Sequence, residues 1–193
     1  MGVELEWKYA ADPAALEAVL RAYPGPWRTV EMETRYYDTA GGALAARRWT
    51  LRLRRENGAA VACLKTPADG RARHEWEAPC AGPEALADAL TAAGAPAELA
   101  ALTAPGLTEV CGARFTRRAL PVGGAELALD RGVLTGGGRE APLCEAELEH
   151  KSGDPAATAA LAARLAARFG LREEPRSKFA RALALRQAAG CAE

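Results

Sequence analysis

Acidic and basic side chains alternate with apolar ones in several short stretches of the sequence. The first stretch is residues 3–9, VELEWKY. Because successive side chains on a β-strand point to opposite faces, Glu4, Glu6 and Lys8 would share one face of a strand and the apolar residues the other. A single stretch of this kind is most simply explained as an amphipathic strand whose polar face meets water.

The same alternation recurs in at least four later stretches. It places Arg52 and Arg54 on one face of a strand, and Glu145, Glu147 and Glu149 on one face of another. Like charges two residues apart on a strand lie about 6–7 Å from each other and repel by about 2–3 kcal/mol at an effective dielectric of about 20. Repulsion of this size persists where a ligand of opposite charge relieves it. We therefore predict a sheet closed on itself, with its charged face inward.

The two kinds of charged face suit the two parts of one ligand. Clustered carboxylates are typical ligands of a hard divalent cation such as Mg²⁺ or Mn²⁺. Clustered arginine and lysine side chains suit phosphoryl oxygens. A cavity that holds both groups suits a metal-bound polyphosphate.

The elements that must position these residues follow from periodicity and turn signals. Asn57-Gly58 and Gly123-Gly124 are typical of hairpin turns, and Asp12 and Asp154 are good helix N-caps. We predict strands at 3–9, 29–38, 49–56, 59–66, 71–77, 108–122, 125–130 and 143–151. We predict helices at about 13–23, 83–93, 97–102, 154–170 and 177–189, with the stretch of about 82–107 forming a helical excursion packed outside the barrel.

Composition excludes several classes of protein. The 193 residues suffice for one domain covering 1–193, and the 25 basic and 25 acidic side chains give no net charge, which argues against a general nucleic-acid binder. No apolar run has membrane length and no signal-peptide pattern opens the chain. We expect a cytoplasmic protein with reduced thiols. Neither a zinc site nor a disulfide framework is indicated by the spacing of Cys63, Cys80, Cys111, Cys144 and Cys191.

In their order along the chain, these motifs resemble the CYTH, or triphosphate tunnel metalloenzyme, family. The resemblance covers nearly the whole chain and is closest to bacterial inorganic triphosphatases, without the C-terminal CHAD domain that those enzymes often carry. It implies an α+β fold: a closed eight-stranded antiparallel β-barrel forming a triphosphate tunnel, with flanking helices outside. The motifs are the opening E-x-E-x-K, Tyr37-Asp38-Thr39, Leu51-Arg52-Leu53-Arg54, Leu64-Lys65, the Arg-x-Glu-x-Glu of 73–77, Leu129-Asp130, the E-x-E-x-E of 145–149 and Ser177-Lys178.

The resemblance also implies roles for individual residues. Glu4, Glu6 and two of Glu145, Glu147 and Glu149 would hold one Mg²⁺ or Mn²⁺. Glu75 and Asp130 would support this metal, or a second metal that activates the attacking water. The triphosphate would be bound by Lys8, Arg52, Arg54, Lys65, Arg117 and Lys178, with Arg73 as a weaker candidate.

Two choices stay open at this point. All three late glutamates share one face, so alternation does not say which two bind metal. The choice of Arg117 over Arg114 or Arg118 rests on the family's F-x-R pattern at 115–117.

The leading hypothesis is a metal-dependent hydrolase that converts inorganic triphosphate to pyrophosphate and phosphate. Within the same family, the alternatives are an adenylate cyclase and a thiamine or nucleoside triphosphatase. A non-catalytic polyphosphate-binding module is an alternative of a different class. The expected partner is a triphosphate-containing small molecule, with no nucleic acid and no membrane, and a homodimer is left open.

Overall fold

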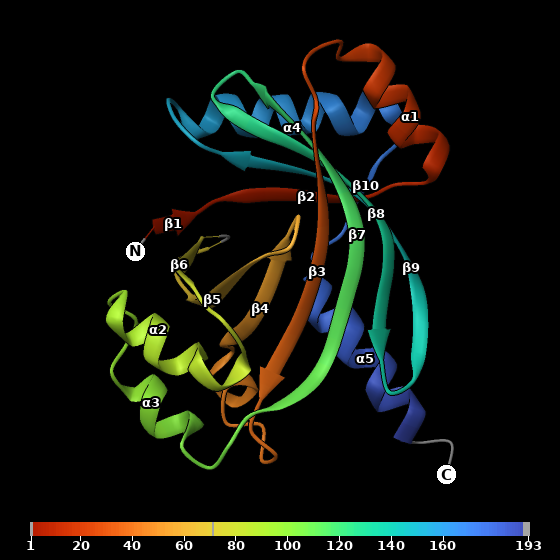
Figure 1. Cartoon of the computed structure of the whole chain (residues 1–193). Helices are drawn as coiled ribbons and strands as arrows, with labels where there is room; N and C mark the ends of the chain where they lie inside the picture. Colours follow the sequence, from red (N-terminus) through yellow and green to blue (C-terminus); the bar gives the residue numbers. More distant parts are fainter. Residues whose placement is uncertain (1, 71, 191–193) are drawn as a thin grey trace.

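The computed structural model describes residues 2–70 and 72–190, which form one curved antiparallel sheet with helices packed around it (Figure 1). The sheet has the strand order β1-β6-β5-β4-β3-β7-β8-β9-β2-β10. Its strands are β1 (Gly2–Glu4), β2 (Glu6–Ala10), β3 (Arg28–Asp38), β4 (Thr50–Glu56), β5 (Ala59–Pro67), β6 (Arg73–Pro79), β7 (Thr108–Val122), β8 (Ala125–Gly136), β9 (Arg139–His150) and β10 (Arg172–Glu173).

Helices occur where caps and periodicity predict them. The side chain of Asp12 accepts a hydrogen bond from the Ala15 amide at 2.7 Å, and that of Asp154 accepts one from the Ala156 amide at 2.9 Å. The helix predicted at 83–93 is divided into a 3₁₀ turn and a shorter α-helix. The helical elements are α1 (Pro13–Ala22), η1 (Ala45–Arg47), η2 (Pro83–Ala85), α2 (Leu86–Ala92), α3 (Glu98–Thr103), α4 (Pro155–Phe169) and α5 (Lys178–Gly190).

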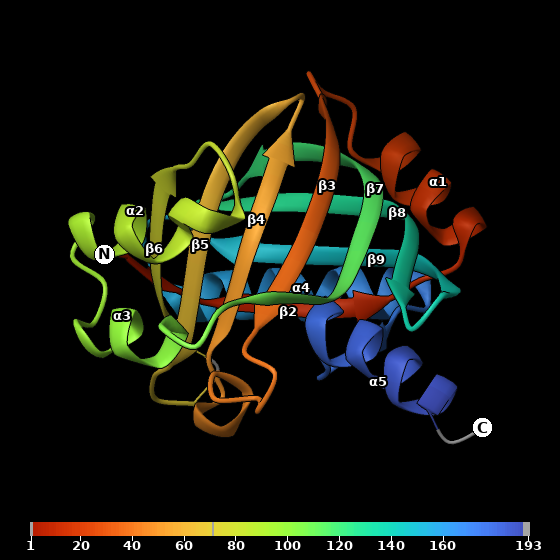
Figure 2. The same ribbon diagram turned by 60° about the horizontal axis from the view of Figure 1, so that its bottom comes forward.

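The N-terminal strand contacts strands on two sides of the molecule. Its first half, β1, pairs with β6, where Glu4 lies opposite Arg73; its second half, β2, pairs with β9, where Lys8 lies opposite Glu147. Only Leu5 separates the two halves. The sheet is therefore barrel-like, with β3, β4 and β5 crossing in front of β8, β9 and β2 in Figure 2. It has ten strands rather than the predicted eight, because the first strand is interrupted at Leu5 and β10 adds a two-residue strand beside β2.

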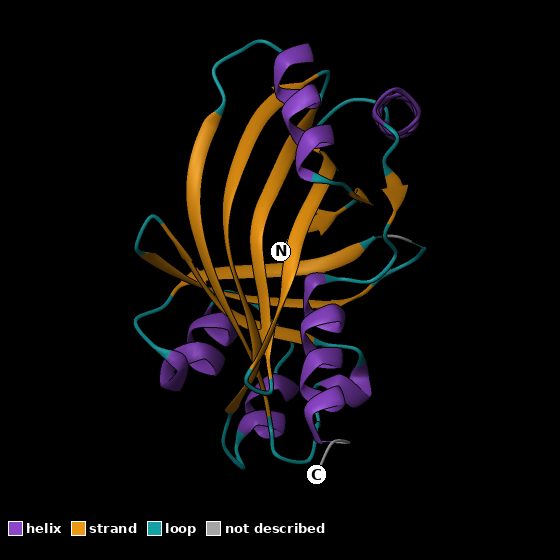
Figure 3. Ribbon diagram, turned by 90° about the vertical axis from the view of Figure 1, so that its right-hand side faces the viewer, coloured by secondary structure: helices purple, strands orange, loops and turns teal. Residues whose placement is uncertain are grey.

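Two helical layers cover the outer face of this sheet, as Figures 1 and 3 show. Helices α1 and α4 pack over β2, β8 and β9, with Val19 of α1 in the same buried cluster as Leu148 of β9. Helices α2 and α3 pack over β4, β5 and β6, with Leu90 of α2 in the same cluster as Leu64 of β5. The apolar side chains of the alternating strands thus lie beneath helices. Each fully buried leucine contributes about 1.5–3 kcal/mol to stability.

Helix α5 differs from the expectation that the helices lie outside the sheet. Phe179 and Ala182 pack with Phe115 and Leu143, which have the same strand parity as the charged residues Arg117 and Glu145. A side chain at Gly136 would overlap the backbone carbonyl of Ala182, so glycine is needed there for α5 to approach β8. The helix therefore enters the inner side of the barrel and brings its own charged residues with it.

The cysteines of the described residues are reduced. Cys63, Cys80 and Cys111 are buried and Cys144 is half-buried; Cys191 lies outside the described residues. None of the helices in the described ranges combines the length and apolarity needed to cross a bilayer.

Candidate active site

The inner side of the barrel encloses a cavity of about 710 Å³. Among the described residues that line it, ten are basic and eight are acidic, so the wall carries nearly balanced charge. Most of the predicted site residues lie on this wall. They are Glu4, Glu6, Lys8, Arg52, Arg54, Lys65, Arg73, Glu75, Arg117, Glu147, Glu149 and Lys178.

Two predicted residues, Asp130 and Glu145, lie behind the wall and have no solvent exposure. They face each other across β8 and β9. Oxygens of Asp130, Glu145 and Glu147 lie within 4.8 Å of one another, and we call these three residues the inner acidic cluster.

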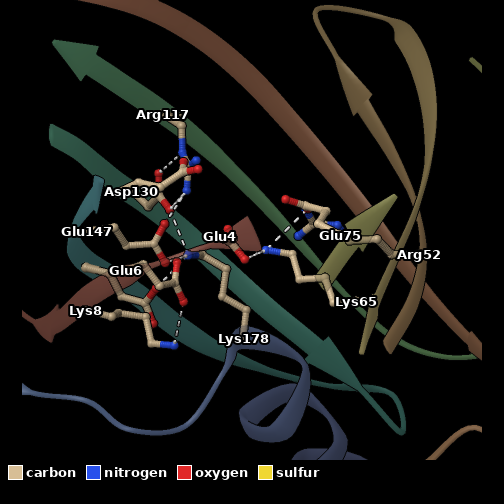
Figure 4. A network of polar contacts seen from close by, with 12 residues as sticks. Glu4, Glu6, Lys8, Arg52, Lys65, Glu75, Arg117, Asp130, Glu147 and Lys178 are labelled. Atoms are coloured by element: carbon tan, nitrogen blue, oxygen red, sulfur yellow. Dashed lines mark hydrogen bonds and ion pairs between the residues drawn. The ribbon is translucent and has the colours of Figure 1, made fainter. Parts of the chain in front are cut away.

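Cations from β7 and α5 neutralise the inner acidic cluster. Arg117 donates two hydrogen bonds to Asp130, from Nε at 2.8 Å and from Nη2 at 2.7 Å. Lys178 Nζ lies 2.8 Å from Asp130 and 2.7 Å from an oxygen of both Glu145 and Glu147. Figure 4 shows Arg117 and Lys178 converging on Asp130 and Glu147. These cations thus neutralise the buried Asp130 and Glu145, while Glu147 also lines the cavity.

These contacts set the protonation states. Burial alone would raise the pKa of Glu147, but Lys178, Arg117 and Lys8 outweigh burial and hold that pKa below its usual range. Burial alone would lower the pKa of Lys178, but the three carboxylates raise it well above its usual value. Both groups are therefore ionised at neutral pH and hold each other in place.

A second ion-pair group lies on β1, β4, β5 and β6. Lys65 pairs with Glu4 and lies 3.4 Å from Glu75, which also accepts from Arg52 at 3.5 Å. Lys65 and Glu75 are directly opposed in the register of β5 and β6. Burial would raise the pKa of Glu75, but Lys65 and Arg52 lower it, so this carboxylate is ionised at neutral pH.

Cys63 belongs to the same group. Its Sγ lies 3.0 Å from Glu75 Oε1, and burial raises the pKa of the thiol to about 12, so the thiol is the donor. The parity of Cys63 with Lys65 on one strand was the signal for this contact, whereas the spacing of the cysteines, which indicates neither a zinc site nor a disulfide framework, gave no hint of it.

Three further carboxylates cross β2, β9 and β8 in register. Glu6 lies opposite Glu149, which lies opposite Glu126, and we call this the outer acidic row. Its ion pairs are looser or more exposed than those of the inner cluster. They join Lys8 to Glu6 at 3.9 Å, Arg28 to Glu126 at 3.4 Å, and the half-exposed Lys151 to Glu149 at 2.7 Å.

The carboxylates of the outer acidic row are less closely neutralised than those of the inner cluster. Burial, together with the nearby Glu147 and Glu4, raises the pKa of Glu6 to about 7. Burial also raises the pKa of Glu149. Carboxylates that repel one another fit a hard divalent cation, because such ions bind oxygen ligands. The donor set of this part of the wall therefore fits Mg²⁺ or Mn²⁺.

The structure distinguishes between three arginines of β7 that strand alternation alone could not rank as substrate-binding residues. Arg117 lies on the cavity wall, whereas Arg114 and Arg118 are exposed, and Arg114 pairs with Glu140. Sequence reasoning missed Arg181, which pairs with Glu145. Its position three residues after Lys178 on one helix face was the available signal, but α5 was expected outside the barrel.

The motif residue Asp38 organises a loop instead of lining the cavity. Its carboxylate accepts hydrogen bonds from the amides of Thr39, Leu44 and Ala45 at 2.7, 2.9 and 3.0 Å. Asp38 is almost fully buried. It therefore fixes the connection between β3 and β4, which borders the cavity.

The family model of the CYTH domain matches residues 3–183 of the chain. The chain belongs to the CYTH family. Its acidic clusters agree with the metal dependence of CYTH proteins, and its relatives include proteins described as triphosphatases and cyclases.

Solved structures share the CYTH fold with this chain. A candidate adenylyl cyclase from Hippeastrum, described as having a dominant triphosphatase activity, is 21% identical with a TM-score of 0.69, covering 96% of this chain and 97% of that one. The PH1819 protein of Pyrococcus horikoshii OT3 is 22% identical with a TM-score of 0.68, covering 95% and 99%. A candidate adenylate cyclase from Bacillus halodurans is 17% identical with a TM-score of 0.61, covering 92% and 96%. At this identity the likeness establishes the fold.

Proposed function

We propose that the protein hydrolyses inorganic triphosphate to pyrophosphate and phosphate in a metal-dependent reaction. The observation that carries the proposal is a cavity whose wall joins cations and carboxylates in nearly equal number. A polyanion gains little from a wall of balanced charge, so it would bind together with a divalent cation that makes up the charge. In this proposal β1 and β2 act as one strand, and the sheet works as a closed eight-stranded tunnel.

The basic residues would bind and orient the phosphoryl groups. Lys65 and Arg52 approach from one side of the cavity, and Arg117, Lys178 and Lys8 from the other (Figure 4). Ion pairs with carboxylates hold most of these cations in position before substrate arrives, which suits a reaction catalysed by alignment and charge stabilisation. Arg54 and Arg73 lie further along the same wall.

The carboxylates would divide into metal ligands and positioning residues. Glu147 and Glu149 line the cavity, whereas Glu145 is fully buried, so we assign Glu147 and Glu149 to the metal with Glu4 and Glu6. A bound Mg²⁺ or Mn²⁺ would neutralise phosphoryl oxygens and orient the chain for attack. Asp130 would position Arg117 and Lys178. Glu75 would position Lys65 and Arg52, or hold the attacking water.

Phosphate release tests this proposal. Purified protein is incubated with triphosphate, ATP or thiamine triphosphate and with Mg²⁺, Mn²⁺ or a chelator. We expect phosphate from triphosphate only when a metal is present. Cyclic AMP from ATP, with no phosphate from triphosphate, would replace the proposal by a cyclase. Tight triphosphate binding without turnover would identify a binding module.

An organic triphosphate is the second candidate substrate. Trp49, Phe115 and Phe179 also line the cavity and offer an apolar surface that inorganic triphosphate does not need. A ratio of kcat/KM that favours ATP or thiamine triphosphate over triphosphate would select this candidate.

A further inference from the structure

The connection between β3 and β4, residues 39–49, is built rigidly at the border of the cavity. Besides the three amides held by Asp38, the Arg48 amide donates to Ala45 O at 2.8 Å and the Trp49 amide to Leu44 O at 3.0 Å. Leu44 and Trp49 are buried in the core cluster under α2 and α3. The backbone of residue 48 is therefore fixed by its surroundings.

The backbone of Arg48 adopts the left-handed helical conformation, with φ 57° and ψ 28°. L-residues other than glycine and asparagine rarely adopt this conformation, and glycine is the usual residue where a helical turn ends in this way. Glycine would complete the turn with less strain. The needs of the backbone alone therefore do not explain an arginine here.

Arg48 is exposed and is one of the residues that line the cavity. Across the described residues its guanidinium has no hydrogen bond or ion pair. By contrast, Arg52, Arg117 and Lys178 on the same wall all contact carboxylates. An unpaired cation receives an anion more readily, because no carboxylate has to be displaced.

We propose that Arg48 is a further substrate-binding residue of this protein, whose guanidinium receives oxygens of the phosphoryl group nearest the β3–β4 connection. The inference rests on the proposed function and adds a residue outside the motifs that carry the resemblance. The rigid loop supplies the position and the free guanidinium supplies the charge. The proposal places this phosphoryl group in the leaving pyrophosphate, away from the phosphorus that water attacks, so Arg48 acts on substrate affinity.

The test replaces Arg48 by residues that suit a left-handed backbone. We expect Arg48→Gly to keep or raise the melting temperature while KM for triphosphate rises about tenfold and kcat stays within about twofold. Arg48→Asn, which also tolerates this conformation, should give the same KM with a stiffer loop. The matched control is Arg47→Ala, because Arg47 is exposed on the preceding turn and does not line the cavity. Its KM should equal that of the wild type.

The outcomes separate this inference from the proposed function. An active wild type with unchanged KM in Arg48→Gly and Arg48→Asn overturns the role of Arg48 alone, as does an equal rise of KM in Arg47→Ala. A wild type that releases no phosphate overturns the proposed function. In that case equilibrium titration with a non-hydrolysable imido analogue of triphosphate decides the matter: about tenfold weaker binding in both Arg48 variants supports the inference, and equal binding overturns it.

Discussion

The inner acidic cluster and the outer acidic row are two sets of three carboxylates facing the same barrel interior, yet they differ in how closely cations neutralise them. In the inner cluster, Lys178 contacts all three carboxylates within 2.8 Å and the pKa of Glu147 is lowered. In the outer row, the nearest cation to Glu6 among the described residues is 3.9 Å away, and the pKa of Glu6 is raised to about 7. Clustered like charges therefore differ in what they indicate, because the fold neutralises the buried Asp130 and Glu145 closely, whereas the cations of the outer row are more distant or more exposed.

The largest expected effect comes from breaking the inner cluster. Asp130→Asn removes the charge that Arg117 and Lys178 share. We expect a loss of about 3 kcal/mol in the free energy of unfolding, because two buried cations lose a partner. Urea unfolding measures it. Glu140→Gln, which alters an exposed pair with Arg114, is the control and should change stability by less than about 0.5 kcal/mol. A loss below about 1 kcal/mol for Asp130→Asn would remove the distinction between the two sets.

The next effect concerns metal at the outer row. Glu6→Gln should lower triphosphate hydrolysis on the order of 100-fold at fixed Mg²⁺ and reduce the rise of melting temperature that Mg²⁺ causes in the wild type. Glu126→Gln is the matched control, since Glu126 lies in the same row but is not a proposed ligand; its activity should stay within about threefold. Equal Mg²⁺ responses in the wild type and Glu6→Gln would contradict the assignment.

The pH dependence of stability sharpens the same contrast. Without metal, the folded state holds the Glu6 proton up to a pH of about 7, whereas an unfolded glutamate loses it near 4.5. An acid whose folded pKa is raised opposes folding increasingly as pH rises through this window. Glu6→Gln in a chelator should therefore match the wild type at pH 5 and exceed its stability by about 1 kcal/mol at pH 8. Guanidinium unfolding at the two pH values measures this, and a constant difference between them would speak against it.

The smallest effect is expected at Cys63. Cys63→Ala removes the thiol that donates to Glu75, and we expect kcat/KM to fall about threefold. Cys63→Ser keeps a donor and should recover most of the loss. Cys80→Ala tests a buried cysteine of the outer core and should leave kcat/KM unchanged. Identical kinetics for Cys63→Ala and Cys63→Ser would show that the thiol only fills space.

The alternation of side chains along strands predicted which face of the sheet each charged residue lies on. It did not predict how deeply each residue is buried. It placed Glu4, Glu6 and Lys8 on the inner face, because parity is a local property of a strand. It treated Glu145 and Glu147 as equivalent, although one is fully buried and the other lines the cavity. That difference arises from α5, whose entry into the barrel depends on distant packing at Gly136 and Phe115.

The missed features share this cause. Arg181 is exposed or buried according to where α5 docks, and no pattern within α5 fixes its docking site. The interruption at Leu5 follows from pairing one strand with two others, β6 and β9, that are far apart in sequence. Sequence periodicity describes single elements, whereas these features depend on how three or more elements meet.

The same interruption has a consequence for how the molecule assembles. The first strand must find partners around residue 73 and around residue 147 before both of its halves are hydrogen-bonded. Contacts of such long sequence separation form slowly, because a large loop has to close first. The first strand is thus fully paired only after β6 and β9 have both formed. A substitution that weakens the first strand would therefore slow its pairing with β6 and with β9 together. It would also slow the closure of the sheet around the cavity.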